Sequence, residues 1–198
     1  MINAFLKAKH WQLFGLIFGI PMVLQFVMVG IIISNLATQS NLDPDLMFNY
    51  MKFFPLFIIL FMVIFFAWFW AVAIGLQKKV PENLSMKVKK FKVFFFIPLV
   101  YLSVFLISFA VFEDFSFSSN IESYAEFFFG CFFLISFLHL FVIFCMYYIM
   151  FFVAKTIKTV ELQRQVKFGD FAGEFFLILY YPIGIWIIQP KINKMMEE

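Results

Sequence analysis

The sequence predicts an all-α, polytopic membrane helix bundle with four transmembrane helices and one further apolar segment near the C-terminus. Three observations support this prediction. Of the 198 residues, 64% are hydrophobic and 14% are charged, whereas about a quarter of the residues in soluble domains are charged. Four continuous apolar runs reach or exceed the length of about 20 residues that a helix needs to cross a bilayer. Positive charge alternates between the segments that separate these runs.

The four apolar runs are predicted to be helices of a single integral membrane domain over residues 1–198. A closed β-barrel also crosses a bilayer, but its strands alternate apolar and polar residues, and these runs are apolar throughout. Prolines inside three of the runs are expected to kink a membrane helix rather than to end it. The predicted spans cover residues 11–34, 53–76, 93–112 and 127–154, and the prolines are Pro21, Pro55 and Pro98.

The distribution of lysine and arginine predicts the orientation of these helices. Basic residues gather before the first span, in the loop Gln77–Lys92, and after the fourth span. The loops Asn35–Lys52 and Glu113–Glu126 instead hold six of the twelve acidic residues and only one lysine, Lys52. Because short cytoplasmic loops carry the excess of positive charge, the N-terminus is predicted to be cytoplasmic. The first apolar run is interpreted as an uncleaved anchor.

The C-terminal apolar segment, residues 171–190, has two interpretations. Its core, "FFLILYYPIGIWIIQP", is short for a span, and Pro182 and Gly184 supply a break at which a hairpin turns. Basic residues flank it on both sides, which favours a re-entrant or in-plane segment with both ends in the cytoplasm. Counted from Phe171, the segment is nevertheless long enough for a fifth crossing, so this alternative stays open. Residues Lys155–Phe168 are expected to continue the fourth helix beyond the membrane.

Small residues at four-residue spacing predict helix contacts on the first two spans. Gly15 and Gly19 form a GxxxG pair, and Ala67, Ala71 and Gly75 repeat the spacing. Small side chains let helix backbones approach closely in lipid, where apolar burial gives no drive for association. We therefore expect these faces to contact another helix, within one chain or between two.

Polar residues inside the apolar segments are the candidate functional residues: His139, Gln25 and Glu174. A proton-coupled transporter would use His139 as a titrating relay with Glu174 as its partner, because both side chains then change charge near neutral pH. The alternative is a neutral His139 that is hydrogen-bonded across helices, with Glu174 in the headgroup region. One histidine and one carboxylate are few groups for coupled transport.

Catalysis is not expected, because the sequence contains no HExxH, GxSxG or P-loop motif and no pair of intramembrane aspartates. Cys131 and Cys145 form no CxxC motif and no cluster with histidine. The sequence therefore predicts no catalytic, metal-binding or cofactor-binding residue. The expected partners are the lipid bilayer and either another membrane protein or a second copy of the chain, with no nucleic acid.

The segments "VELQR" and "GDFAGEFFLILYYPIGIWIIQPKIN", within Val160–Asn193, resemble the shared C-terminal region of an uncharacterised family of small bacterial polytopic inner-membrane proteins. The resemblance implies a location in the bacterial inner membrane. It carries over no catalytic or binding residue. Two functions are predicted: a non-catalytic membrane subunit or scaffold with a basic cytoplasmic face or, as the alternative, a small transporter or channel component that uses His139 and Glu174.

Overall fold

The computed structural model describes residues 2–38, 54–112 and 121–197. Over these residues the chain forms helices and no strands, which confirms the all-α prediction. Four stretches of helix are long and apolar enough to cross a membrane, and each overlaps one of the predicted spans. They are His10–Asn35, Phe57–Lys79, Val88–Ser108 and Phe132–Leu162. The predicted acidic loops, Asn35–Lys52 and Glu113–Glu126, lie mostly outside the described residues.

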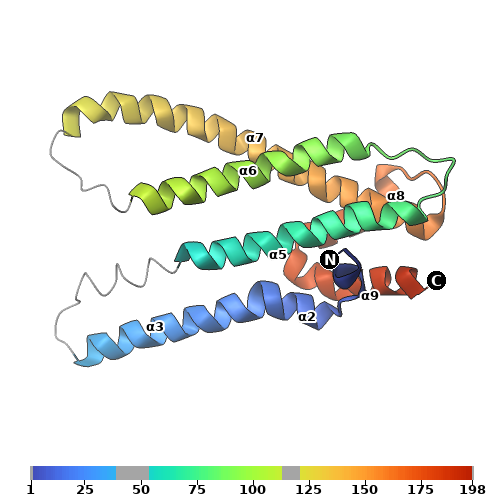
Figure 1. Cartoon of the computed structure of the whole chain (residues 1–198), viewed down its shortest axis with the longest axis horizontal. Helices are drawn as coiled ribbons and strands as arrows, with labels where there is room; N and C mark the ends of the chain where they lie inside the picture. Colours follow the sequence, from blue (N-terminus) through green and yellow to red (C-terminus); the bar gives the residue numbers. More distant parts are fainter. Residues whose placement is uncertain (1, 39–53, 113–120, 198) are drawn as a thin grey trace. The chain divides into compact units, whose positions relative to one another are not determined.

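Contacts between residues divide the chain into two compact units. The first unit comprises Met1–Met86 and Val153–Glu198, and the second comprises Lys87–Phe152. Figure 1 labels the helices of both units. One long helix, α7 (Ile121–Leu162), contributes residues to each unit. The prediction of a single membrane domain over the whole chain stays a prediction.

The first unit begins with the short helices α1 (Ile2–Lys7) and α2 (His10–Phe14), followed by η1 (Gly15–Gly19) and α3 (Ile20–Thr38). The segment η1 is a π-helix in which the N–H of Ile20 donates to the carbonyl of Gly15, five residues back. Pro21 follows directly, and its ring clashes with the carbonyl four residues earlier and has no N–H to donate. A wider turn before Pro21 relieves this conflict, so the helix continues through the proline.

The core of the first unit lies on α5 (Phe54–Gly75), which ends in a 3₁₀ turn, η2 (Leu76–Lys79). Trp68 and Phe69 on α5 are completely buried. Helix α1 packs against α5 and α9, and Leu6 is its buried residue. No periodic pattern was available to predict a helix as short as α1, whose six residues fall before the first apolar run.

The second unit pairs α6 (Val88–Phe112) with α7, and the two helices run side by side (Figure 1). Aromatic rings form much of the contact, with ring centroids 4.5 Å apart for Phe94 and Tyr148 and 4.7 Å apart for Phe91 and Phe152. Helix α6 contains Pro98 and continues through it, as predicted for a proline in a membrane helix.

Helix α7 ends at Leu162, six residues before the predicted end at Phe168. The next residue, Gln163, has a φ of 50°, a left-handed conformation that stops a helix. The Gln163 Nε2 atom stabilises this turn by donating to the carbonyls of Val160 at 2.7 Å and Lys79 at 3.2 Å. The expected continuation of the helix to Phe168 was therefore wrong. The sequence has neither glycine nor proline at this turn to mark it.

The C-terminal apolar segment forms two helices, α8 (Phe168–Leu179) and α9 (Tyr181–Glu197), joined at Tyr180. The break thus lies just before Pro182, which is tolerated in the first turn of α9 because its missing N–H has no partner to lose there. Gly184 lies so close to α8 that an added Cβ would collide with the backbone of Leu177. The two helices therefore fold back on each other as a hairpin, which we call the C-terminal hairpin.

Candidate functional site in the C-terminal hairpin

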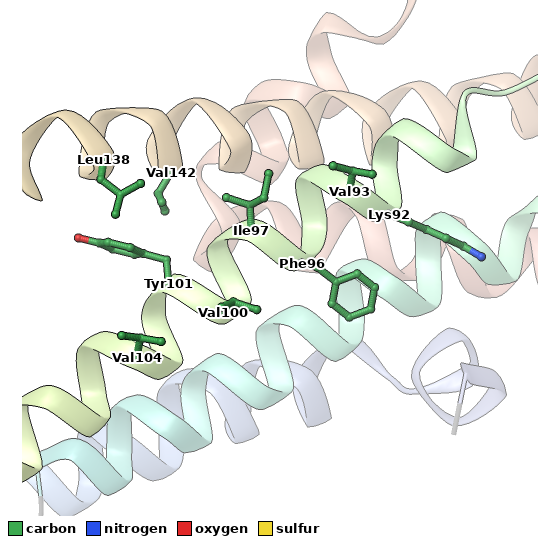
Figure 2. A pocket seen from close by; sticks show the side chains of 9 residues that line it. All are labelled: Lys92, Val93, Phe96, Ile97, Val100, Tyr101, Val104, Leu138 and Val142. Atoms are coloured by element: carbon green, nitrogen blue, oxygen red, sulfur yellow. The ribbon is translucent and has the colours of Figure 1, made fainter. Parts of the chain in front are cut away.

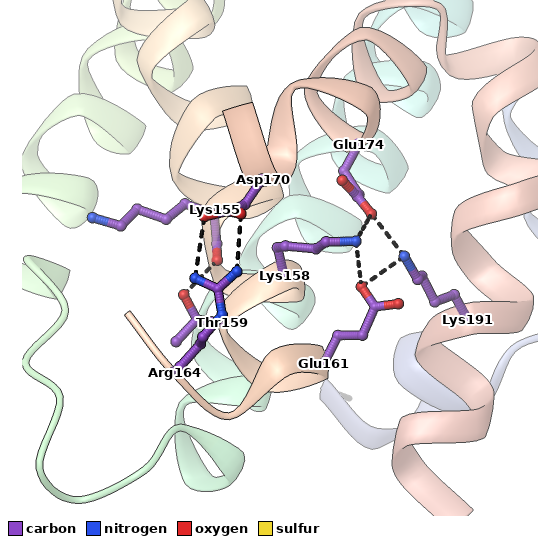
Figure 3. Close-up of polar contacts among 8 residues, drawn as sticks. All are labelled: Lys155, Lys158, Thr159, Glu161, Arg164, Asp170, Glu174 and Lys191. Carbon is purple, nitrogen blue, oxygen red and sulfur yellow. Dashed lines mark hydrogen bonds and ion pairs between the residues drawn. The ribbon is translucent and has the colours of Figure 1, made fainter. Parts of the chain in front are cut away.

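Four charged side chains join the end of α7 to both helices of the C-terminal hairpin. Lys158 Nζ lies 3.0 Å from Glu161 Oε2 and 3.2 Å from Glu174 Oε1. Lys191 Nζ lies 2.8 Å from Glu161 Oε2 and 2.7 Å from Glu174 Oε1. Each lysine therefore contacts both carboxylates, and the four groups close into an electroneutral ring (Figure 3). We call these residues the charge ring.

Glu174 is the most buried member of the charge ring, with 9% of its side chain exposed. Burial alone would raise the pKa of Glu174, but hydrogen bonds from Lys191, from its backbone and from Lys158 outweigh burial and hold the pKa below its usual value. The carboxylate is therefore ionised at neutral pH. An ionised group this buried is stable only while both lysines stay in contact with it.

A second ion pair fixes the start of α8. Arg164 Nη2 lies 3.0 Å from Asp170 Oδ1, and Asp170 Oδ2 accepts a 2.7 Å hydrogen bond from the backbone N–H of Lys167. The backbone bond and Arg164 both lower the pKa of Asp170. Asp170 thus caps the first turn of α8, where a negative charge is favoured. Lys158 and Glu161 pair at i,i+3 spacing on α7, whereas Arg164 pairs with Asp170 across the turn between α7 and α8.

Gln189 on α9 forms a second buried cluster, and its side chain is fully enclosed. Its Oε1 accepts a 2.9 Å hydrogen bond from Trp68 Nε1 on α5. Its Nε2 lies 3.0, 3.3 and 2.9 Å from the carbonyl oxygens of Phe5, Leu6 and Ala8 and 3.0 Å from Asn193 Oδ1. Its two N–H groups are shared among these four acceptors. The last carbonyls of a helix have no partner within it, so Gln189 caps α1 from a distant part of the chain.

Tyr181, the first residue of α9, lies in an aromatic cluster. Its ring centroid is 5.1 Å from that of Trp68 and 5.3 Å from that of Phe65. The Tyr181 hydroxyl has no hydrogen-bond partner within the described part of the chain. Leaving a buried hydroxyl unpaired costs about 1–3 kcal/mol, so the ring contacts must offset this to hold the hairpin against α5.

The predicted polar residues have different partners. Tyr101 Oη lies 3.1 Å from His139 Nδ1, which agrees with the interpretation of His139 as hydrogen-bonded across helices. Glu174 contacts Lys158 and Lys191, and Gln25 is exposed on α3. His139 and Glu174 thus each contact a residue other than the partner that a relay would require.

The predicted small-residue faces differ in their surroundings. A Cβ added at Gly75 would lie 2.6 Å from Leu6 Cδ1, so this glycine permits the close packing of α1 on α5. Ala71 is buried and Ala67 is half-buried on the same helix. A Cβ added at Gly15 or Gly19 would meet no atom within 4 Å, so within the described residues this pair makes no close helix contact. Its role between two chains stays a prediction.

The residues that form the charge ring with Glu174 were not identified as site residues from the sequence: Lys158, Glu161 and Lys191. Gln189 was not identified either. Gln189 is an uncharged polar residue in an apolar run, so the sequence carries the same signal for Gln189 as for Gln25. Lys158 and Lys191 were attributed to topology, because no pattern links them to Glu174, which is 16 and 17 residues away in the sequence.

The helices and their apolar lengths define the class of this protein: it is an α-helical membrane protein. No protein-family model matches the chain, and neither a curated protein nor a solved structure is significantly similar to it. Among the described residues, no three His, Cys, Asp or Glu side chains gather as metal ligands. Function must therefore be inferred from the charge ring, the Gln189 cluster and the exposed faces of the helices.

Proposed function

We propose that the C-terminal hairpin enters the cytoplasmic face of the bacterial inner membrane and returns to the same side. The pair of Lys191 with Glu161 carries this proposal, because it brings α9 back to the end of α7, from which α8 departs. Helices α8 and α9 have 12 and 17 residues, or about 18 and 25 Å, whereas the hydrocarbon core is about 30 Å thick. Each helix by itself is too short to cross.

The exposed side chains of the hairpin support the same topology. Large apolar residues near the turn are 53–67% exposed: Phe176, Tyr180, Ile183 and Ile187. Charged residues lie at the opposite, open end, at Asp170 and Lys194. An apolar tip with a charged base is the pattern expected of a segment that dips into lipid and keeps its ends in water.

Labelling of single cysteines tests this topology. In a chain with Cys131→Ala and Cys145→Ala, we expect Lys194→Cys to react with a membrane-impermeant maleimide only after the inner membrane of spheroplasts is permeabilised. The comparison variant is Asp45→Cys, in the loop predicted to face outward, which should react in intact spheroplasts. Reaction of Lys194→Cys in intact spheroplasts would show that the C-terminal segment crosses the membrane.

For the molecule as a whole, we propose the function of a non-catalytic integral membrane subunit or scaffold that packs with other membrane helices and presents a basic cytoplasmic face. The polar residues near the hairpin support this, because Glu174 and Gln189 tie helices together instead of lining an open path. Helix α3 offers a face for a partner: its apolar side chains are exposed, and the Gly15 and Gly19 positions before it have free space around them.

The alternative, a transporter or channel component that uses His139 and Glu174, has less support from these contacts. A carboxylate in a proton relay needs a pKa raised toward neutrality, whereas two lysines lower the pKa of Glu174. The hydrogen bond of His139 to Tyr101 fits a structural role as well as a relay.

Site-specific photocrosslinking in cells tests the scaffold proposal. A photoreactive amino acid, p-benzoylphenylalanine, replaces Phe26 on α3, which is 64% exposed. We expect one discrete protein adduct, with either a second copy of the chain or one other membrane protein. The adduct should persist after His139→Leu, since a scaffold needs no titrating group there.

The matched control places the same amino acid at Ile107 on α6, which is also 64% exposed. At Ile107 we expect crosslinks to lipid and no discrete protein adduct. Lipid crosslinks alone at both positions would contradict a partner on α3. Loss of the Phe26 adduct after His139→Leu, with the protein still folded, would favour the transporter alternative.

A further inference from the structure

The second unit carries an apolar groove along α6 and α7, with a volume of about 710 Å³. Its walls are Val93, Phe96, Val100 and Val104 on α6 and Leu138 and Val142 on α7. Lys92 lies at one end of this row, and Tyr101 lies toward the other (Figure 2). The groove is therefore apolar along its length and basic at one mouth.

The groove follows one stripe of α6. The residues of this stripe recur at three- and four-residue spacing, so their side chains share one face of the helix. They are Lys92, Val93, Phe96, Val100 and Val104. From Lys92 to Val104 the stripe is about 18 Å long at 1.5 Å per residue. One leaflet contributes about 15 Å, half of the hydrocarbon core. The groove therefore has the length of one acyl chain that starts at the membrane surface.

The basic mouth has the charge of a phosphate-binding surface. Lys87, Lys89, Lys90 and Lys92 surround the first turn of α6 and are exposed. Lys89 precedes Val93 by one helical turn and so extends the face of the groove. Helix α6 contains basic but no acidic residues in its sequence, so its own charge is positive. The N-terminus of a helix adds a partial positive charge at the same place.

Tyr101 brings a hydroxyl group to the wall of the groove. An acyl chain would avoid this hydroxyl if it were unpaired. Its hydroxyl lies 3.1 Å from His139 Nδ1 and is therefore already hydrogen-bonded. The groove thus presents the ring of Tyr101 to an apolar occupant without leaving a hydroxyl unsatisfied.

We propose that this groove binds one anionic phospholipid from the leaflet that Lys89 faces. The headgroup phosphate pairs with Lys89 and Lys92, and one acyl chain lies along the stripe from Val93 toward Val104. Recognition of an anionic headgroup distinguishes this site from the general contact of any membrane helix with lipid. The proposal is independent of the scaffold function, because it concerns residues of the second unit alone.

Native mass spectrometry of the full-length chain in mild detergent tests the proposal. The probes are phosphatidylglycerol and phosphatidylcholine with identical acyl chains, added at equal concentration. We expect about tenfold more bound phosphatidylglycerol, since each nearby lysine favours an anionic headgroup and salt screens part of this effect. The preference should fall as the ammonium acetate concentration rises.

Two sets of variants separate the headgroup from the acyl chain. The double variant Lys89→Gln with Lys92→Gln should remove the preference for phosphatidylglycerol. The control is the double variant Lys78→Gln with Lys79→Gln. It removes the same amount of charge outside α6 and should retain the preference. Val100→Trp fills the groove and should reduce binding of both lipids. If Val100→Trp lowers the thermal midpoint, the smaller replacement Val100→Phe takes its place.

Equal binding of the two lipids by the wild-type chain would overturn the proposal. So would a preference that survives Lys89→Gln with Lys92→Gln. A two-chain species that disappears in the Val100 variants, without any bound lipid in the wild type, would show instead that a second copy occupies the groove.

Discussion

Gly184→Ala should open the C-terminal hairpin and cost about 3 kcal/mol or more of stability. The added methyl group would collide with the carbonyl and Cα of Leu177, which are backbone atoms of α8. A flexible side chain can turn away from such a collision, but a helix backbone moves only as a whole. The loss of stability should therefore lie at the upper end of the range for substitutions that overpack a core. For a chain of this size we expect the thermal midpoint in detergent, followed by circular dichroism, to fall by more than about 6 °C.

Gly173→Ala is the matched control for this prediction. Gly173 lies on α8, and an added Cβ there would meet no atom within 4 Å. Alanine also favours a helix over glycine by up to about 1 kcal/mol, so this variant should be as stable as the wild type or more stable. Equal midpoints for Gly184→Ala and Gly173→Ala would show that α8 and α9 do not pack this closely in the membrane protein.

Glu174→Gln should destabilise the protein by about 2 kcal/mol, because it leaves the lysines of the charge ring with a surplus positive charge. Breaking a fully buried ion pair costs about 3–5 kcal/mol, and the 20% and 29% exposure of Lys158 and Lys191 lets water recover part of that. The thermal midpoint in detergent measures the change. Adding Lys191→Gln to this variant removes the surplus charge and should restore part of the lost stability.

This effect depends on pH in a defined direction. Because the pKa of Glu174 is lower in the folded chain than its usual value of 4.5, its stabilisation is fully present above about pH 4.5. It is lost as the pH falls through the lowered pKa. The difference between wild type and Glu174→Gln should therefore be constant from about pH 6 to 8 and should shrink in more acidic buffer.

Asp170→Asn supplies the control for charge removal near the same helices. Its partner Arg164 has 56% of its side chain exposed, and exposed ion pairs contribute little to stability. We expect a small change in midpoint. A fall as large as that of Glu174→Gln would mean that general loss of negative charge, and not the charge ring, explains the result.

The C-terminal hairpin shows how far the sequence predicts such a site. The short apolar length, the basic flanks and the break near Pro182 favoured a segment that turns over a fifth crossing. The structure divides the segment into two helices at Tyr180, and its path through the membrane stays a prediction. Glu174 was selected because a carboxylate in an apolar segment is rare. Its partners were not predicted, because Lys191 reaches it only after the chain has reversed at Tyr180.

The end of α7 illustrates the opposite case. Nothing in "VELQR" marks a helix end, since every residue in it is compatible with a helix. Gln163 ends the helix by adopting a left-handed backbone that its own side chain stabilises through the carbonyls of Val160 and Lys79. Lys79 is 84 residues away, so this turn depends on a contact that local sequence does not contain.

By itself the sequence determined the class of this protein and the places of its four apolar helices, because the length and hydropathy of a run are local properties that lipid selects directly. Tertiary structure alone decided what the polar residues do. Gln189 caps α1 across more than 180 residues, and Glu174 joins lysines from two other helices. Such hydrogen bonds and ion pairs depend on the distance between residues in the folded chain, and the spacing of those residues in the sequence does not give this distance.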